Sequence, residues 1–186
     1  MRTRGWMLLT VAVTAALVLV GCGGDGLVQP PDGGANGDGG DGAADFDAAS
    51  YDGTWAGNWE NQTFSSTGSA SAEIDVDEAG GTVDITLDLG GNVLGGSDPA
   101  PINLSGTFDD TGFSLDQNVA VLGDLSITID ADGNIAGSAT NLPSAGIERV
   151  DFTGTRSGDT MTVSYTVTFA GDSATATGTL TLDLQP

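Results

Sequence analysis

From residue 51 onward, the chain alternates apolar and polar residues with a period of two. Two clear runs read VDITLDL at 83–89 and MTVSYTVTF at 161–169. Such alternation places apolar side chains on one face of a β-strand and polar side chains, here mostly Thr and Asp, on the other. No segment of this region shows a helical period. The pattern therefore predicts an all-β domain whose sheet buries one face and exposes the other.

Short turn sequences such as ADGN at 131–134 and SGD at 157–159 separate the alternating runs. Tight turns of this kind connect antiparallel neighbours, so consecutive strands form a meander. We predict an antiparallel up-and-down barrel of about 8–10 strands over residues 51–186, and keep an open sandwich as the alternative. The longest breaks, at 90–101 and 141–147, are expected to form loops at a barrel mouth. The strands are expected to start near residues 54, 70, 82, 102, 112, 125, 135, 149, 160 and 174.

Two Gly-x-Trp units open this region, GTW at 53–55 and GNW at 57–59. They resemble the first strand of the lipocalin-like and avidin-like barrels, in which the tryptophan lies across the closed end of an up-and-down barrel. The resemblance implies the same architecture and the binding of a small apolar ligand. Trp55 and Trp59 share a parity and face the same side of the strand. We therefore expect both to contact such a ligand or, alternatively, to plug the core.

Glycines also fall on the inward parity of their strands, among them Gly106 and Gly178. A glycine at such a position makes room for a large neighbouring side chain or leaves a cavity. These two outcomes separate two hypotheses for the domain. In the first, the barrel binds a small apolar or amphipathic molecule or a partner. In the second, it is a non-catalytic structural or interaction domain of the cell envelope with a solid core.

The N-terminus has the pattern of a secretory signal. Arg2 and Arg4 precede an apolar run over residues 6–20, which is shorter than the roughly 20 residues of a membrane-spanning helix. The sequence LVGC at 19–22 resembles the bacterial lipobox. That resemblance implies cleavage after residue 21 and acylation of Cys22, which would anchor the protein in a bacterial membrane. An uncleaved membrane anchor with an incidental cysteine is the alternative.

The residues that follow the lipobox predict a linker and the location of the protein. Residues 22–50 are dominated by Gly, Asp and Ala, and such a composition predicts a disordered linker between the acylated Cys22 and the barrel. Gly23 occupies the position where an aspartate would resemble an inner-membrane retention signal. The protein is therefore predicted to be lipid-anchored to the bacterial cell envelope, with the outer membrane favoured over the inner membrane.

The charge of the chain excludes several partners and kinds of chemistry. It has 26 acidic residues, 4 basic residues and no histidine, and its formal net charge is −22. All four basic residues are arginine, so no basic patch for nucleic acid is expected. Without histidine or lysine there is no Ser-His-Asp triad, no imidazole metal ligand and no Schiff base. We predict that the protein is not an enzyme, and we assign no catalytic residue and no cofactor.

Carboxylates remain as candidates for chemistry. The sequence DADGN at 130–134 has oxygen donors at the first, third and fifth positions of a calcium loop, but Ile135 and Asn141 stand at the sixth and twelfth positions instead of Gly and Glu. Because Asp-Gly also suits a hairpin, we predict a turn there and assign no metal ligand. Calcium stabilisation stays open as a variant of the solid-core hypothesis. Glu60 and Glu148 are the residual candidate acids, and an ion pair with Arg149 is the simpler explanation of Glu148.

Overall fold

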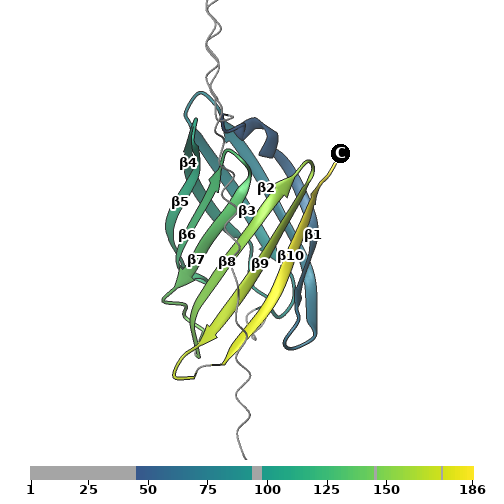
Figure 1. Ribbon diagram of the computed structural model, residues 1–186, viewed down its shortest axis with the longest axis vertical. Helices are drawn as coiled ribbons and strands as arrows, with labels where there is room; N and C mark the ends of the chain where they lie inside the picture. Colours follow the sequence, from purple (N-terminus) through teal and green to yellow (C-terminus); the bar gives the residue numbers. More distant parts are fainter. Residues whose placement is uncertain (1–44, 94–97, 145, 173) are drawn as a thin grey trace, which may run out of the picture. The chain divides into compact units, whose positions relative to one another are not determined.

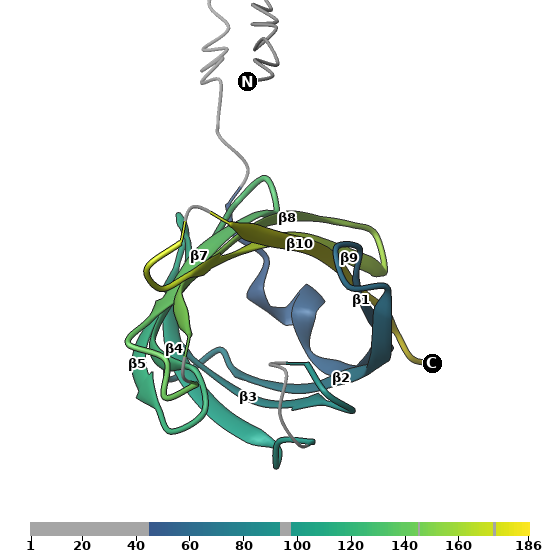
Figure 2. The same ribbon diagram turned by 90° about the horizontal axis from the view of Figure 1, so that it is seen from below.

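The alternating runs form ten β-strands that pair antiparallel in chain order and close into a barrel (Figures 1 and 2). The structure, a computed structural model, describes residues 45–93, 98–144, 146–172 and 174–186. The strands are β1 (Gly53–Asn61), β2 (Ser66–Asp77), β3 (Thr82–Leu89), β4 (Ile102–Asp109), β5 (Gly112–Val119), β6 (Gly123–Asp130), β7 (Asn134–Thr140), β8 (Ile147–Ser157), β9 (Thr160–Phe169) and β10 (Thr175–Leu184). β1 closes the sheet because it pairs with both β2 and β10. The predicted up-and-down barrel is confirmed, and its closure rules out the open sandwich.

The predicted strand starts agree closely with the structure, and β2 shows the largest difference. This strand begins at Ser66 rather than near residue 70. Its first residues, STGS at 66–69, lack apolar alternation, but they pair with the end of β1 through Trp59↔Gly68 and Asn61↔Ser66. Pairing with β1 therefore starts β2 before the alternating pattern of its sequence begins.

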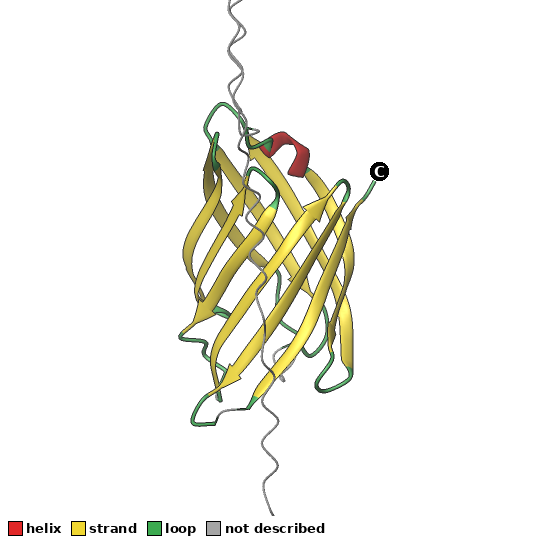
Figure 3. Cartoon of the chain, in the orientation of Figure 1, coloured by secondary structure: helices red, strands yellow, loops and turns green. Residues whose placement is uncertain are grey.

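The two ends of the barrel differ in their connections. Tight hairpins after β2, β4, β6 and β8 lie at one end, together with a 3-10 helix, η1 (Ala48–Tyr51) (Figures 1 and 3). We call this the capped end. Both longer breaks, at 90–101 and 141–147, lie at the opposite end, which we call the long-loop end. Residues 94–97 and 145 within them are outside the described residues.

The ordered structure reaches into the segment predicted as linker. Phe46 and Ala48 pack on the capped end, with the Phe46 ring 5.4 Å from the ring of Tyr51 and 6.3 Å from that of Phe108. A single aromatic residue in a Gly/Asp-rich stretch thus finds apolar surface to cover. Residues 1–44 lie outside the described residues, and they include the predicted signal peptide, Cys22 and most of the predicted linker. No helix within the described ranges is long and apolar enough to cross a membrane.

The predicted parity of the strands is confirmed by burial. Inward-facing Trp55, Leu104 and Leu115 retain 0%, 3% and 2% of their accessible surface. Asp75 and Asp84, predicted to face water, are exposed and lie opposite each other on β2 and β3. Apolar burial inside a closed wall supplies the main stabilisation of such a fold.

Candidate functional site

Trp55 and Trp59 are the two most deeply buried large side chains of the described chain, at 0% and 2% exposure. The Trp55 Nε1 donates to the Tyr51 carbonyl oxygen at 2.8 Å, and the Trp59 Nε1 donates to the Gly90 carbonyl oxygen at 2.8 Å. Trp59 also lies directly against Gly68, where a side chain would overlap its ring. Both indole donors are therefore used within the protein, and only the rings are left to face a ligand. Contact of either tryptophan with a ligand stays a prediction.

Arg156 is an inward-facing charged residue that the sequence analysis did not single out. It continues the inward parity of Phe152 and Gly154 on β8 and pairs with Met161. Its guanidinium lies 4.5 Å from the Tyr51 ring centroid and 5.6 Å from the Trp55 ring centroid. Its Nη1 and Nη2 donate to the side-chain and carbonyl oxygens of Ser50 at 2.7 and 2.8 Å.

These contacts build a plug over one end of the barrel, which we call the cap and define as Phe46, Tyr51, Trp55 and Arg156. Burial raises the pKa of Tyr51, and the neighbouring Arg156 partly offsets this rise. The Nε of Arg156 is buried and has no acceptor among the described residues. Parity alone could have identified Arg156, because inward positions of the strands otherwise hold mostly apolar residues.

Several inward glycines are covered by rings. A methyl group at Gly106 would lie 2.5 Å from the Phe113 ring. Methyl groups at Gly137 and Gly178 would overlap the rings of Phe152 and Tyr165. At these positions glycine makes room for a large neighbour and leaves no cavity, which is the outcome that the solid-core hypothesis requires.

Burial is incomplete for some of the inward-facing residues of the strands. Several inward-facing aliphatic side chains near the strand centres are only half-buried, although the barrel is closed. They pack against the buried core, and Ile85 also borders a hollow on the outer wall. A small apolar pocket of about 20 Å³ lies beside the cap and is bordered by Tyr51, Ile85 and Phe113. We call the half-buried set the mid-barrel lining: Ile85, Leu87, Ile127, Val163 and Leu180.

Buried and partly buried inward side chains alternate along the whole barrel, since Phe108 at the capped end and Leu89 and Phe169 at the long-loop end are also partly buried. The cap covers one end. At the other end, inward-facing Val119, Leu125, Ala139 and Val167 retain 8%, 4%, 3% and 8% of their accessible surface. Among the strand residues that the structure describes, no inward-facing residue is Asp or Glu.

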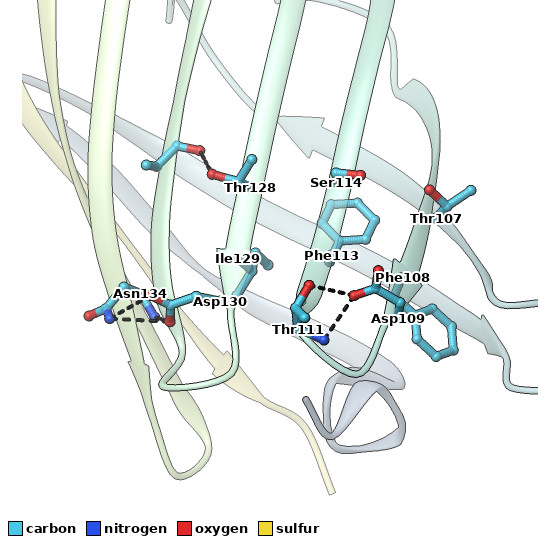
Figure 4. Close-up of a pocket in the computed structure, with 12 residues that line it drawn as sticks. Thr107, Phe108, Asp109, Thr111, Phe113, Ser114, Thr128, Ile129, Asp130 and Asn134 are labelled. Atoms are coloured by element: carbon cyan, nitrogen blue, oxygen red, sulfur yellow. Dashed lines mark hydrogen bonds between the residues drawn. The ribbon is translucent and has the colours of Figure 1, made fainter. Parts of the chain in front are cut away.

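A separate hollow of about 390 Å³ lies on the outer wall across β4 to β7 (Figure 4). Its two carboxylates, Asp109 and Asp130, accept hydrogen bonds from residues of the turns that follow them. Asp109 accepts hydrogen bonds from the backbone and hydroxyl of Thr111 at 2.8 and 2.6 Å. Asp130 accepts from the backbone N–H of Asn134 at 2.9 Å and from its side-chain amide at 2.8 Å. These hydrogen bonds lower the pKa of both carboxyl groups.

The carboxylate candidates from the sequence find ordinary structural roles. The turn predicted at 130–134 is confirmed as the hairpin between β6 and β7. Glu60 and Glu148 are both exposed, and Glu148 lies at an irregularity in the pairing of β8 with β9. The explanation of Glu148 by an ion pair was wrong, because Arg149 pairs with Asp151 at 2.6 Å on the same face of β8. Within the described ranges, no group of three or more Cys, Asp or Glu side chains is placed to hold a metal ion.

Comparison with known proteins supports the fold alone. No protein-family model matches the chain, and no curated protein matches it. Among solved structures, the chain is similar to the crystal structure of Rv2717c from M. tuberculosis, with a TM-score of 0.52 and 11% sequence identity. The alignment covers 74% of this chain and 94% of that one. At such low identity, the likeness shows a shared barrel fold and carries no functional residue across.

Proposed function

We propose that the protein is a lipid-anchored component of the bacterial cell envelope whose barrel binds a small apolar or amphipathic molecule. The observation that carries the ligand proposal is the mid-barrel lining, because five inward-facing aliphatic residues of a closed barrel are only partly buried. The anchoring proposal rests on the lipobox resemblance at residues 19–22. Acylation of Cys22 would hold the barrel at a membrane surface.

The chemistry of the lining defines the class of ligand. A charged group buried there without a partner would lose its hydration, so an uncharged ligand is favoured. Tyr165 and Asn61 are inward polar groups, but each is already bonded: the Tyr165 hydroxyl donates to the Glu60 carbonyl oxygen at 3.1 Å, and the Asn61 side chain accepts from the Phe64 N–H at 2.9 Å. Because rings already cover several of the inward glycines, the ligand is expected to be small.

A second candidate function is a structural or interaction domain with a solid core. The covered glycines favour it, since Phe113, Phe152 and Tyr165 occupy the room that these positions leave. In this reading the residual space has no ligand, and the barrel acts through its outer surface on an unidentified protein partner. Calcium stabilisation belongs to this candidate.

Native mass spectrometry and probe binding distinguish the two candidates. The Cys22→Ser chain, secreted behind a signal that is not a lipoprotein signal, keeps the whole barrel and can be purified without detergent. The ligand proposal expects either a reproducible excess mass or saturable 1:1 binding of the neutral fluorophore N-phenyl-1-naphthylamine. A bare mass without saturable binding would support the solid-core candidate.

A matched pair of variants locates the site. Val163→Phe adds bulk to the mid-barrel lining and is expected to weaken probe binding at least about tenfold, because close-packed interiors accommodate little extra volume. Thr162→Phe adds a ring on the exposed face of the same strand and should leave binding unchanged. Equal effects of the two substitutions would place the probe on the outer surface. The anchor is tested by detergent phase partitioning. The chain that keeps Cys22 should enter the detergent phase, and the Cys22→Ser chain should stay in the aqueous phase.

A further inference from the structure

The wall of the barrel is incompletely paired between β4 and β5. Their register contains only Thr107↔Ser114, Phe108↔Phe113 and Asp109↔Gly112, all near the capped end. On its other side, β5 pairs with β6 along its whole length, from Gly112 to Val119. We call the unpaired part, residues 102–106 of β4 and 115–119 of β5, the seam.

The side chain of Gln117 bridges the seam. Its Nε2 donates to the Asn103 carbonyl oxygen at 3.1 Å, and its Oε1 accepts a hydrogen bond from the Ser105 N–H at 3.1 Å. The Gln117 side-chain amide thus makes the two hydrogen bonds that a backbone of β5 would otherwise make to β4. A side-chain amide can rotate away without moving either strand, whereas a paired ladder cannot open without separating the strands.

The seam lies directly outside the mid-barrel lining. On its inner side, Leu104 pairs with Ile85 and Leu115 pairs with Ile127. Ile85 and Ile127 are half-buried members of that lining, so they flank the seam from both sides. A hollow of about 360 Å³ lies over its outer side and is bordered by Gln117, Asn103 and Ser105.

We propose that the seam is the entrance through which an uncharged apolar molecule reaches the barrel interior, and that Gln117 is the group that closes it. This inference rests on the proposed ligand-binding function. It follows from the pairing of the described strands, since β4 and β5 have the shortest register of any strand pair in the described wall. Passage requires Gln117 to release β4 and the side chains of Leu104 and Leu115 to move apart.

A reversible disulfide tests the entrance. Extending the register beyond Thr107↔Ser114 places residue 105 opposite residue 116, and both side chains are exposed. Ser105→Cys with Asp116→Cys in the Cys22→Ser chain would lock the seam when the strands approach to the Cα separation of a disulfide, about 4.4–6.8 Å, and its formation is checked by mass. The control is Ser126→Cys with Ser138→Cys, which joins β6 and β7 where these residues already pair.

The measurement is stopped-flow binding and release of N-phenyl-1-naphthylamine. The oxidised seam disulfide is expected to slow both rates at least about tenfold without changing Kd, because a closed route alters a barrier and not the bound state. Addition of reductant should restore the rates, and the β6–β7 disulfide should leave them unchanged. Gln117→Ala, which needs no disulfide, should accelerate both rates by about tenfold, whereas the neighbouring Asp116→Ala should not.

The outcomes separate the entrance from the function. Saturable probe binding with rates that neither the seam disulfide nor Gln117→Ala changes would overturn the entrance and leave the ligand-binding proposal intact. No saturable binding to the parent chain would overturn the ligand-binding proposal and the entrance together. Equal slowing by both disulfides would also overturn the entrance, because it would show a general effect of rigidity.

Discussion

The guanidinium of Arg156 lies 4.5 Å from the ring centroid of Tyr51, which joins the segment before the first strand to the eighth strand of the barrel. This contact explains how the cap is held in a strongly acidic protein. The ion pair found among the described residues, Arg149–Asp151, lies on the surface with about half of each side chain exposed, at 48% and 49%. Arg156 is instead held by two aromatic faces and by the oxygens of Ser50.

The first prediction concerns the energy of this contact. Arg156→Met should lower the free energy of unfolding by about 2–3 kcal/mol, because it removes a partly desolvated cation–π contact and two charge-assisted hydrogen bonds. Arg156→Lys should recover less than half of that loss, since an ammonium group cannot reproduce the planar fork. Urea unfolding measures both values. Arg149→Met is the control and should cost less than about 1 kcal/mol, as expected of an exposed ion pair. Equal losses at the two arginines would contradict this account of the cap.

The second prediction is a loss of stability at alkaline pH. Burial raises the pKa of Tyr51 above its unfolded value of 10.0, so the folded state holds the phenolic proton more tightly than the unfolded state. This contribution to stability is fully present below pH 10 and is lost as the pH rises through the folded pKa. Tyr51→Phe should therefore flatten the fall in the free energy of unfolding above pH 10.

The measurement is a series of urea titrations across that range, with tyrosinate absorbance followed in parallel. The pKa of Tyr165 is also raised by burial, so Tyr165→Phe should remove a separate part of the pH dependence. If the Tyr51→Phe protein lost stability above pH 10 as steeply as the parent, the buried phenol would not be the cause.

Local alternation predicted the strands and their inward faces, because a half-buried strand must alternate whatever its partners are. Closure could not be read in the same way, since it depends on β1 meeting β10 across most of the domain. The covering of Gly106 by Phe113 also depends on the pairing of separate strands. Glycine alone allows a cavity as readily as a filled space, so the sequence left both hypotheses open.

Parts of the site could not be predicted because they depend on partners that are distant in the sequence. Phe46 lies in a stretch whose composition predicts disorder, and its aromatic neighbours are known only once the barrel is built. The seam depends on register, because Leu104 and Leu115 alternate as regularly as residues of fully paired strands. Gln117 occupies an inward position, but its two backbone partners lie on a different strand and have no local sequence signal.

The third prediction concerns like charges on the outer wall. Asp75 of β2 lies directly opposite Asp84 of β3, and both are exposed. Carboxylates in this arrangement repel each other, so Asp84→Asn should raise the free energy of unfolding by roughly 0.2–1 kcal/mol at low ionic strength. The gain should shrink in 1 M salt, where the screening length is about 3 Å.

Thermal or urea unfolding at two salt concentrations gives the result. Glu73→Gln is the control because Glu73 lies opposite Thr86, and it should give a smaller gain. A salt-independent gain at Asp84 would assign the effect to something other than repulsion between the two carboxylates.

The fourth prediction separates the two proposed functions through Phe113. Its ring covers Gly106 and borders the small apolar pocket beside the cap, so Phe113→Leu should open space inside the barrel. Both functions expect a loss of stability of about 1 kcal/mol or more, because a well-packed ring is replaced by a smaller side chain. They differ in binding. If the interior is a ligand site, the added space should tighten binding of N-phenyl-1-naphthylamine, whereas a solid structural core should lose stability and gain no saturable binding.

Phe64→Leu supplies the matched control, because this phenylalanine is 63% exposed and the same substitution there should change neither stability nor binding. Urea unfolding and fluorescence titration on the same samples give both quantities. Tighter binding in Phe113→Leu but not in Phe64→Leu would place the probe inside the barrel beside the small apolar pocket. Loss of stability without any gain in binding would favour an outer surface as the functional part of the domain, because the interior would then act only as a packed core.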